Sequence, residues 1–384
     1  MRDYTLEQLF DLQMGKTPAR DESSYWSDGI HDWISIRDLT NSDKYINVTN
    51  EKISDIAVKK TGIRLIPQNT VIMSFKLSIG KVAITSKDMY SNEAIMAFHD
   101  KKVTEIIPEY LYYLLLGHKW DEGSNKAVMG ITLNKATLSK IIISIHETKT
   151  QNKIVTTLGL LDQIIKNKKQ QLSEYDQFIK SRFVEMFGEV EFNTKKHDLI
   201  KYGDVFELNA GGTPSKNKPE YWKNGTISWI GSNLCQNSII YENDGKYITE
   251  EGYKNSSARL FPIDTVLVAL VGATIGKTAL LKFETATNQN VLGIKGIKEA
   301  GFNPYFVYYY TQGLYNKFLN IGDGGFSMAS KKFISELDIA KVNIENQNDF
   351  AKFVQQVDKL KFVVQKSLDQ TQMLFDSLMQ EYFG

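Results

Sequence analysis

The sequence of 384 residues has little of several things that a catalytic or membrane protein needs. Its only cysteine, Cys235, rules out an internal disulfide and a cysteine-rich metal site. Its five histidines form no HxH or HxxxH pair, and none lies near Cys235 in sequence, so we predict no metal and no catalytic residue. None of the seven prolines adjoins another, which excludes the Asn/Asp-Pro-Pro-Tyr/Phe motif of adenine methyltransferases.

No apolar run approaches the ~18 residues that span a membrane, and the N-terminus lacks the apolar stretch of a signal peptide. We therefore expect a cytoplasmic protein without membrane contact. The formal net charge is only +1, so any contact with nucleic acid must come from local basic patches.

What the sequence does contain is a repeat of the whole chain at an offset of 196 residues, and repeats of this kind decide the fold. Its aromatic and glycine landmarks recur in register, apart from a slip to 195 in the middle. They are Gly15-Lys16-Thr17-Pro18 and Gly211-Gly212-Thr213-Pro214, Tyr25-Trp26 and Tyr221-Trp222, Trp33-Ile34 and Trp229-Ile230, and Ile79-Gly80-Lys81 and Ile275-Gly276-Lys277. The same small core is therefore expected twice.

Each repeat ends in a stretch whose apolar residues recur at alternating spacings of three and four, which predicts a long helix with one apolar seam. Each helix would reach roughly 55 Å at about 1.5 Å per residue. The predicted seam residues are Ile154, Leu158, Leu161, Ile165, Leu172 and Ile179 in the first helix, and Phe350, Val354, Val357, Leu368 and Phe375 in the second. Lys168, Arg182 and Lys361 occupy seam positions too, and we expect them at the edge of the seam.

Before each long helix, β-branched residues and glycines predict a strand-rich core, followed by a helix that starts at Pro108 or Pro304, a glycine loop and a last strand. The last strands are expected at 140–145 and 338–344. The fold class is α/β (α+β), with globular domains at 1–149 and 189–345 and helices at 150–188 and 346–384. Because the connection after Gly188 is short, we expect an antiparallel helix pair with pseudo-two-fold symmetry.

Two similar but non-identical domains held at a fixed separation suit duplex DNA, whose half-sites are read at separations near one turn, about 34 Å. This arrangement predicts a bipartite, asymmetric target.

The ordered motifs Gly-x-Thr-Pro, Tyr-Trp, Trp-Ile, Ile-Gly-Lys, a glycine loop and a long helix ending in Ser181–Gly188 occur twice, and together they resemble the specificity subunit of type I restriction-modification systems. The resemblance implies two target recognition domains, two helical spacers, and assembly with two methyltransferase (modification) subunits and with restriction/translocase subunits. Of the Pro-Pro-Leu-x-Glu-Gln segment that usually precedes each spacer, only Gln151 and Gln347 remain.

Candidate contacts to double-stranded DNA are loop residues with side chains suited to phosphates or base edges. They are Lys16, Arg37, Lys44, Lys76 and Lys81 in the first domain, and Lys216, Lys218, Asn233, Lys277 and Gln289 in the second. Each of them could equally be an ordinary solvated residue. Trp33 and Trp229 are predicted in the core. The outer helix face at 166–171 is either a methyltransferase contact or a solvated surface.

Two other hypotheses stay open at this point. The chain could be a coiled-coil adaptor that binds proteins and has no DNA specificity. It could also bind a nucleotide at Gly272–Thr278, although a phosphate-binding loop has four residues between its glycines and this segment has three. A tight turn with an exposed lysine fits this segment better, and we predict no cofactor.

Overall fold

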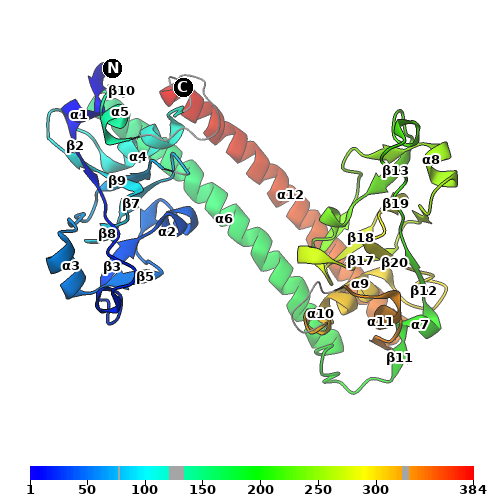
Figure 1. Cartoon of the computed structure of the whole chain (residues 1–384). Coiled ribbons are helices and arrows are strands. Elements are labelled where there is room, and N and C mark those ends of the chain that lie inside the picture. Colours follow the sequence, from blue (N-terminus) through cyan, green and yellow to red (C-terminus); the bar gives the residue numbers. More distant parts are fainter. Residues whose placement is uncertain (77, 121–133, 322–327) are drawn as a thin grey trace. The chain divides into compact units, whose positions relative to one another are not determined.

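The computed structural model describes residues 1–76, 78–120, 134–321 and 328–384 (Figure 1). The expected glycine loops at Gly130–Thr132 and Gly325–Ser327 lie outside these residues. The chain forms two compact units. Unit 1 comprises Met1–Lys169 and Lys366–Gly384, and unit 2 comprises Gln170–Gln365. Each unit therefore contains part of both long helices, α6 (Thr148–Phe187) and α12 (Ile344–Phe383).

Unit 1 is built mainly from short strands. They are β1 (Arg2–Thr5), β2 (Phe10–Met14), β3 (His31–Ile34), β4 (Tyr45–Ile46), β5 (Glu51–Ile53), β6 (Val71–Ser74), β7 (Val82–Thr85), β8 (Tyr90–Ser91), β9 (Ile95–Asp100) and β10 (Ile142–Ile145). The helices are α1 (Leu6–Leu9), η1 (Ser23–Tyr25), α2 (Ile36–Asn41), α3 (Asp55–Thr61), α4 (Pro108–Gly117) and α5 (Lys135–Ser139). The sheets have the strand orders β2-β9-β6-β7-β4, β5-β3-β8 and β1-β10.

Unit 2 repeats this set of elements. Its strands are β11 (Leu199–Lys201), β12 (Glu207–Ala210), β13 (Ile227–Ile230), β14 (Ser238–Ile240), β15 (Tyr247–Ile248), β16 (Leu260–Phe261), β17 (Val266–Ala269), β18 (Thr278–Leu281), β19 (Thr285–Thr287), β20 (Val291–Lys295) and β21 (Asp338–Ala340). Its helices are α7 (Tyr202–Val205), η2 (Pro219–Tyr221), η3 (Ser232–Leu234), α8 (Glu250–Lys254), η4 (Gly272–Thr274), α9 (Pro304–Gly313), α10 (Tyr315–Leu319) and α11 (Lys331–Ser335). The sheets are β12-β20-β17-β18-β14, β15-β13-β19-β16 and β11-β21.

The five-stranded sheets of the two units have the same topology, which confirms the repeat predicted from the sequence, whereas the second sheet has three strands in unit 1 and four in unit 2. In the five-stranded sheets, β2, β9, β6, β7 and β4 correspond in order to β12, β20, β17, β18 and β14. The pairing of β4 with β7 is parallel, as is that of β14 with β18, whereas the other pairings in these sheets are antiparallel. Both helices expected at a proline are present as α4 and α9.

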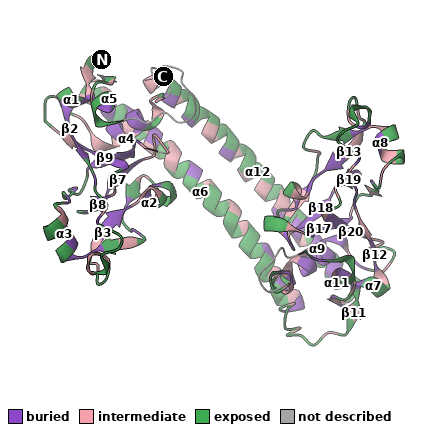
Figure 2. Ribbon diagram, viewed as in Figure 1, coloured by how far each residue is buried: buried purple, intermediate pink, exposed green. Residues whose placement is uncertain are grey.

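Both faces of each five-stranded sheet are covered, so its central strands are continuously buried, as is typical of such strands. In unit 1, α4 packs on β6 and β7, and a cluster with Ile72, Ala83 and Leu39 covers the other face. In unit 2, α9 packs on β17 and β18. Figure 2 shows buried residues concentrated in these sheets and in the helices beside them.

The two long helices run in opposite directions through each unit. In unit 1 the first half of α6 lies with the last part of α12, where Phe375 and Phe383 pack on Tyr113 and Tyr110 of α4. In unit 2 the second half of α6 meets the first part of α12, where Phe350 packs edge-on against Phe183 and Phe187. The structure thus confirms that α6 packs with α12.

Most predicted seam residues are buried in the structure. Only Leu161 and Leu172 are half-buried, while Ile154, Leu158, Ile165, Ile179, Phe350, Val354, Val357, Leu368 and Phe375 are buried. The charged seam positions are half-buried. Lys361 pairs with Asp176 of the other helix at 2.5 Å. No helix in the part of the chain that the structure describes is both long and apolar enough to cross a membrane.

The helices begin at Thr148 and Ile344, two residues before the expected starts at 150 and 346. The last strand of unit 2 was expected to reach 344, but β21 ends at Ala340 and Ile344 opens α12. β21 ends where its partner β11 begins, since Leu199 is paired with Ala340.

One buried glutamine lies in the first turn of each long helix, Gln151 in α6 and Gln347 in α12. Gln347 accepts a hydrogen bond from the Asn303 N–H at 2.9 Å and donates to the Val342 carbonyl at 2.8 Å. Gln151 accepts from the Ile107 N–H at 3.0 Å and donates to the Glu105 and His146 carbonyls at 2.8 and 2.9 Å. Each amide thus joins the start of a long helix to the segment that leads into α4 or α9.

We predict that Gln347→Leu lowers the free energy of unfolding by about 1–3 kcal/mol, because it leaves a half-buried N–H and a half-buried carbonyl without their partner. Gln356→Leu is the matched control, since Gln356 is exposed on the same helix. Urea denaturation followed by circular dichroism measures both. Equal stability of the two variants would show that the amide contributes nothing to helix attachment.

Candidate nucleic-acid interface

Four loop segments of unit 1 meet at one edge and are joined by backbone hydrogen bonds. The Lys16 N–H donates to the Ser91 carbonyl at 2.8 Å, the Asn92 N–H to Ile34 at 3.0 Å and the Phe75 N–H to Ala94 at 3.0 Å. We call this region, with its counterpart in unit 2, the loop edge. In unit 1 it comprises residues 15–22, 35–41, 75–76 with 78–81, and 92–94.

Unit 2 builds the same loop edge from residues 211–218, 231–236, 270–277 and 288–290. The Gly212 N–H donates to Thr287 at 2.8 Å, the Asn288 N–H to Ile230 at 3.2 Å and the Leu270 N–H to Asn290 at 2.8 Å. The sequence motifs that recur at the offset of 196 are thus brought together in space in each unit.

Glycine is required at the start of the first segment because the backbone approaches its neighbour closely. A Cβ atom on Gly15 would lie 2.2 Å from the Asn92 carbonyl oxygen, and one on Gly211 would lie 2.1 Å from Thr287 Oγ1. This contact explains the glycine of both Gly-x-Thr-Pro motifs.

The two framework tryptophans are in the core, as predicted. Trp33 and Trp229 are 1% and 7% exposed. Their indole N–H groups donate to the Lys16 carbonyl at 3.1 Å and to the Gly212 carbonyl at 3.0 Å. Each is also edge-on to the tryptophan of the Tyr-Trp motif, at centroid distances of 5.1 and 5.2 Å. These hydrogen bonds attach the first segment of each loop edge to the core, and both indole rings are buried.

Three predicted DNA contacts also tie segments of the loop edge together. Lys81 Nζ donates to Thr40 Oγ1 at 2.6 Å, and Lys277 Nζ donates to Gln236 Oε1 at 2.8 Å, from the equivalent position. Gln289 accepts a hydrogen bond from Thr213 at 2.5 Å. Lys277 is half-buried, so the exposed lysine expected in this turn is a framework residue at least in part.

Three other candidates have no side-chain partner among the described residues. Arg37 lies in the first turn of α2, and Asn233 occupies the equivalent position in η3. Both side chains are exposed, as is that of Lys216. Their hydrogen-bonding groups are therefore available to a ligand.

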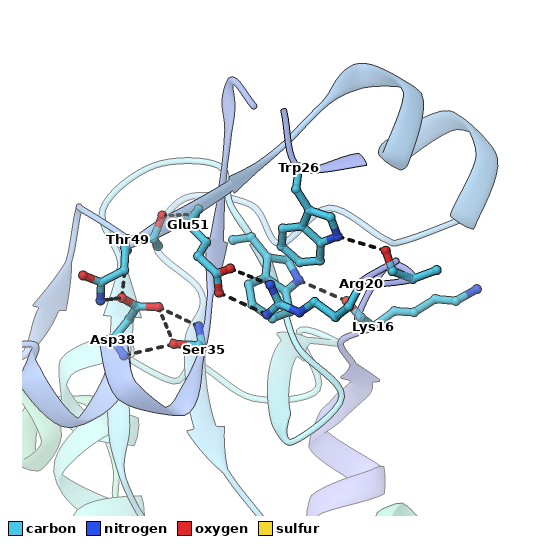
Figure 3. Close-up of polar contacts among 10 residues, drawn as sticks. Lys16, Arg20, Trp26, Ser35, Asp38, Thr49 and Glu51 are labelled. Atoms are coloured by element: carbon cyan, nitrogen blue, oxygen red, sulfur yellow. Dashed lines mark hydrogen bonds and ion pairs between the residues drawn. The ribbon is translucent and has the colours of Figure 1, made fainter. Parts of the chain in front are cut away.

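Arg20, which occupies the position equivalent to Lys216, was missed in the sequence analysis. Its guanidinium lies 3.8 Å from the centre of the Trp26 ring and binds Glu51 through both terminal nitrogens at 2.5 and 3.0 Å (Figure 3). The Glu51 carboxylate raises the Arg20 pKa above its ordinary value. The offset of 196 was the available signal, since it aligns Arg20 with Lys216.

The remaining lysines make local contacts. Lys16 Nζ donates to the Thr61 carbonyl at 2.5 Å, Lys218 Nζ donates to the Tyr221 hydroxyl at 2.9 Å, and Lys76 Nζ lies 5.4 Å from the Phe75 ring. Lys44 Nζ donates to the Tyr113 hydroxyl at 2.8 Å and lies 3.9 Å from Asp162. It thus contacts α4 and α6 in the structure, which favours a packing role, and its DNA contact stays a prediction.

The local geometry disfavours a nucleophilic role for Cys235 and nucleotide binding at Gly272–Thr278. Burial raises the pKa of the Cys235 thiol to about 12, so little thiolate forms at neutral pH. The segment Gly272–Lys277 is followed by strand β18, whereas a phosphate-binding loop opens a helix. The nucleotide-binding hypothesis is therefore not supported. Among the described residues, no group of three histidine, cysteine or acidic side chains could hold a metal ion.

Comparison with known proteins places the chain among sequences that share this duplicated organisation. The sequence model of a family described as "Type I restriction modification DNA specificity domain" matches residues 1–174 and 195–370. The specificity subunit of the type I restriction enzyme MjaIX from Methanocaldococcus jannaschii is 28% identical over 254 residues, covering 63% of this chain and 56% of that protein. The EcoR124I/EcoR124II specificity subunit from Escherichia coli is 28% identical over 179 residues, covering 45% of this chain and 41% of that protein. The chain thus spans about half the length of these relatives.

Solved structures show the same fold. The S subunit of a type I restriction-modification system from M. genitalium aligns with a TM-score of 0.56 at 16% identity, covering 100% of this chain and 96% of that one. A chain from a type I restriction-modification assembly aligns with a TM-score of 0.57 at 13% identity, covering 100% and 97%.

The geometry predicts that Lys44→Met and Arg37→Met differ in stability. Lys44→Met removes a half-buried ammonium from Tyr113 and should lower the free energy of unfolding by about 1–2 kcal/mol. Arg37→Met removes only an exposed side chain and should change it by less than about 0.5 kcal/mol. Urea denaturation of both variants tests this, and a larger loss for Arg37→Met would contradict the assignment.

Proposed function

Because the chain belongs to the family of type I restriction-modification DNA specificity domains, we propose that it recognises DNA sequence as the non-catalytic specificity subunit of such a system. Each unit reads one half of a bipartite target through its loop edge. The chemistry of methyl transfer and cleavage resides in partner subunits.

The observation that carries this proposal is that one loop edge is built twice and presents different side chains. The backbone hydrogen bonds, the buried tryptophans and the lysine from the Ile-Gly-Lys turn recur in both units. The outward positions differ, with Arg37 where unit 2 has Asn233, and Arg20 where it has Lys216. A constant framework with variable outward residues suits the reading of two different sequences.

The outward side chains have the chemistry of base and phosphate recognition. Arginine binds guanine and asparagine binds adenine through paired hydrogen bonds in the major groove, whereas lysine more often contacts phosphate. We therefore assign Arg37 and Asn233 to base contacts, and Lys216 and Lys76 to backbone contacts. Arg20 is stacked on Trp26 and held by Glu51, so its orientation is fixed before DNA binds.

The long helices serve in this proposal as the spacer between half-sites. Each has 40 residues, about 60 Å at 1.5 Å per residue, and each contributes to both units. Because the two loop edges carry different residues, the target is asymmetric.

Exposed apolar side chains on both helices support recruitment of partner subunits. On α6 they include Leu160 and Phe178, which are 59% and 54% exposed, and on α12 Phe362 and Met373, which are each 71% exposed. Such large apolar side chains, left exposed along the helices, are available for protein contacts. We assign these surfaces to the two methyltransferase subunits, with restriction/translocase subunits joining the assembly.

The proposal is tested by mapping adenine methylation of the host genome with and without this gene, using single-molecule sequencing. A two-part asymmetric motif that loses its methylation on deletion is expected. A complex with its methyltransferase that shows no salt-dependent affinity for duplex DNA would instead favour the protein-binding adaptor.

We predict that Arg37→Ala in the assembled complex weakens binding to the methylated motif by about 10- to 100-fold, as loss of a paired contact to guanine costs about 1–3 kcal/mol. Fluorescence anisotropy with the motif and with a shuffled duplex measures the effect. Lys135→Ala is the control, because Lys135 is exposed on α5, beside α1 and away from the loop edge. Unchanged affinity for the motif in Arg37→Ala would remove this residue from the base contacts.

A further inference from the structure

Unit 2 contains a cleft of about 1320 Å³ between its globular part and the two long helices. Asp358 of α12 and Asp176 of α6 line it from the helices. Tyr309 and Gln312 of α9 and Ser238 of β14 line it from the globular part. All of these residues belong to unit 2.

One polar atom in this cleft, Asp358 Oδ2, is buried without a hydrogen-bond partner among the described residues. Burial raises the pKa of the Asp358 carboxyl above its ordinary value. A buried carboxylate oxygen that has lost water and gained no partner is costly, and such groups in native proteins call for a specific explanation.

The lysines nearest to Asp358 are engaged elsewhere. Lys361 Nζ lies 2.5 Å from Asp176. Lys282 Nζ lies 2.8 Å from Asp264 and 4.2 Å from the centre of the Tyr305 ring. Lys180 and Lys359 line the cleft with exposed side chains. No cation forms an ion pair with Asp358 within the residues that the structure describes.

At the equivalent site of unit 1, the carboxylate has both a phenol and an ammonium as neighbours. There Asp162 accepts a hydrogen bond from the Tyr113 hydroxyl at 2.6 Å, and that hydroxyl accepts one from Lys44 Nζ at 2.8 Å. Lys44 Nζ also lies 4.8 Å from the centre of the Tyr113 ring and 3.9 Å from Asp162. The carboxylate, the phenol and the ammonium form one compact group.

The two sites correspond residue by residue. The proline starts of α4 and α9 align Tyr113 with Tyr309, and the buried glutamines Gln151 and Gln347 align Asp162 with Asp358. In the sheet, Tyr45 pairs with Ile84, while Ile239 pairs with Leu280 at the equivalent position, so Lys44 aligns with Ser238. Unit 2 therefore keeps the carboxylate and the phenol but has a serine in place of the lysine.

We propose that the cleft of unit 2 binds a primary alkylammonium group from outside the chain, held by Asp358 and Tyr309 where Lys44 Nζ lies in unit 1. Serine lacks the last three methylene groups and the ammonium of a lysine, so the space that they would fill is left open. An ammonium has three N–H donors, enough for the carboxylate and the phenol oxygen together. Tyr241 and Tyr308 also line the cleft, and aromatic rings beside an ammonium add cation–π attraction.

The first arm of the test titrates 1,5-diaminopentane into the full-length protein by calorimetry at low salt. We expect binding that weakens at least about tenfold in Asp358→Asn, equivalent to about 1.4 kcal/mol. Asp349→Asn is the matched control, because Asp349 is an exposed acid on the same helix and pairs only with Lys352 among the described residues. Binding that is equally strong in Asp358→Asn would count against the site.

The second arm supplies the ammonium from the chain itself through Ser238→Lys. Compared with Ser238→Met, which has similar bulk but no charge, we expect the lysine variant to melt about 2 °C higher and to bind no diamine. This difference in melting temperature between Ser238→Lys and Ser238→Met should disappear when Asp358→Asn is also present. If Ser238→Lys fails to fold, the diamine titration alone decides.

The two arms also distinguish the source of the ammonium. A positive result in both arms means that free diamines occupy the site. Stabilisation by Ser238→Lys without diamine binding means that the ligand is a tethered lysine side chain of a protein partner. Absence of both effects would overturn the proposal.

Discussion

The structure depends on the burial of one apolar stripe along each of two 40-residue helices. An isolated amphipathic helix gains most of its stability from packing of its apolar face, so each stripe must lie against other elements. In unit 2 this places Phe350 of α12 against Phe183 and Phe187 of α6. In unit 1, residues 366–384 complete the core through Phe375 and Phe383. The core of unit 1 is therefore complete only when residues 366–384 have packed against residues 1–169.

The same packing fixes the loop edges relative to the helices within each unit. α4 and α9 contact both the central strands and the long helices, and the buried glutamines hold the backbone at their N-termini. The loop edge of each unit, which begins at Gly15 or Gly211, is thus connected to the helix seam through packed strands and helices. Recognition residues placed on such a support lose little freedom on binding, which favours specific contacts over adaptable ones.

Much of this organisation could be predicted from the sequence, because the repeat aligns the first half of the chain with the second. The offset of 196 anticipates two copies of one topology, and the burial of Trp33 and Trp229 follows from aromatic residues kept in register. The role of Lys44 could not be anticipated, because its partner Tyr113 lies 69 residues away along the chain. Arg20 was missed for a related reason. Its importance comes from stacking on Trp26 and pairing with Glu51, and only tertiary structure brings these together.

Where the two copies diverge, the energetic consequences differ between an exposed and a buried position. At the loop edge, Arg37 and Asn233 can differ freely because neither supports the framework, and the difference bears on the ligand alone. At Lys44 and Ser238 the difference removes a cation from a buried carboxylate, which should cost several times more than an exposed change. An asparagine or leucine at 358 would relieve this cost, yet the aspartate is present and Oδ2 has no partner among the described residues. Lys361 and Lys282 attract this charge only weakly, because burial still raises the Asp358 pKa and neither lysine forms an ion pair with it among the described residues. A cation from outside the chain would supply the missing partner.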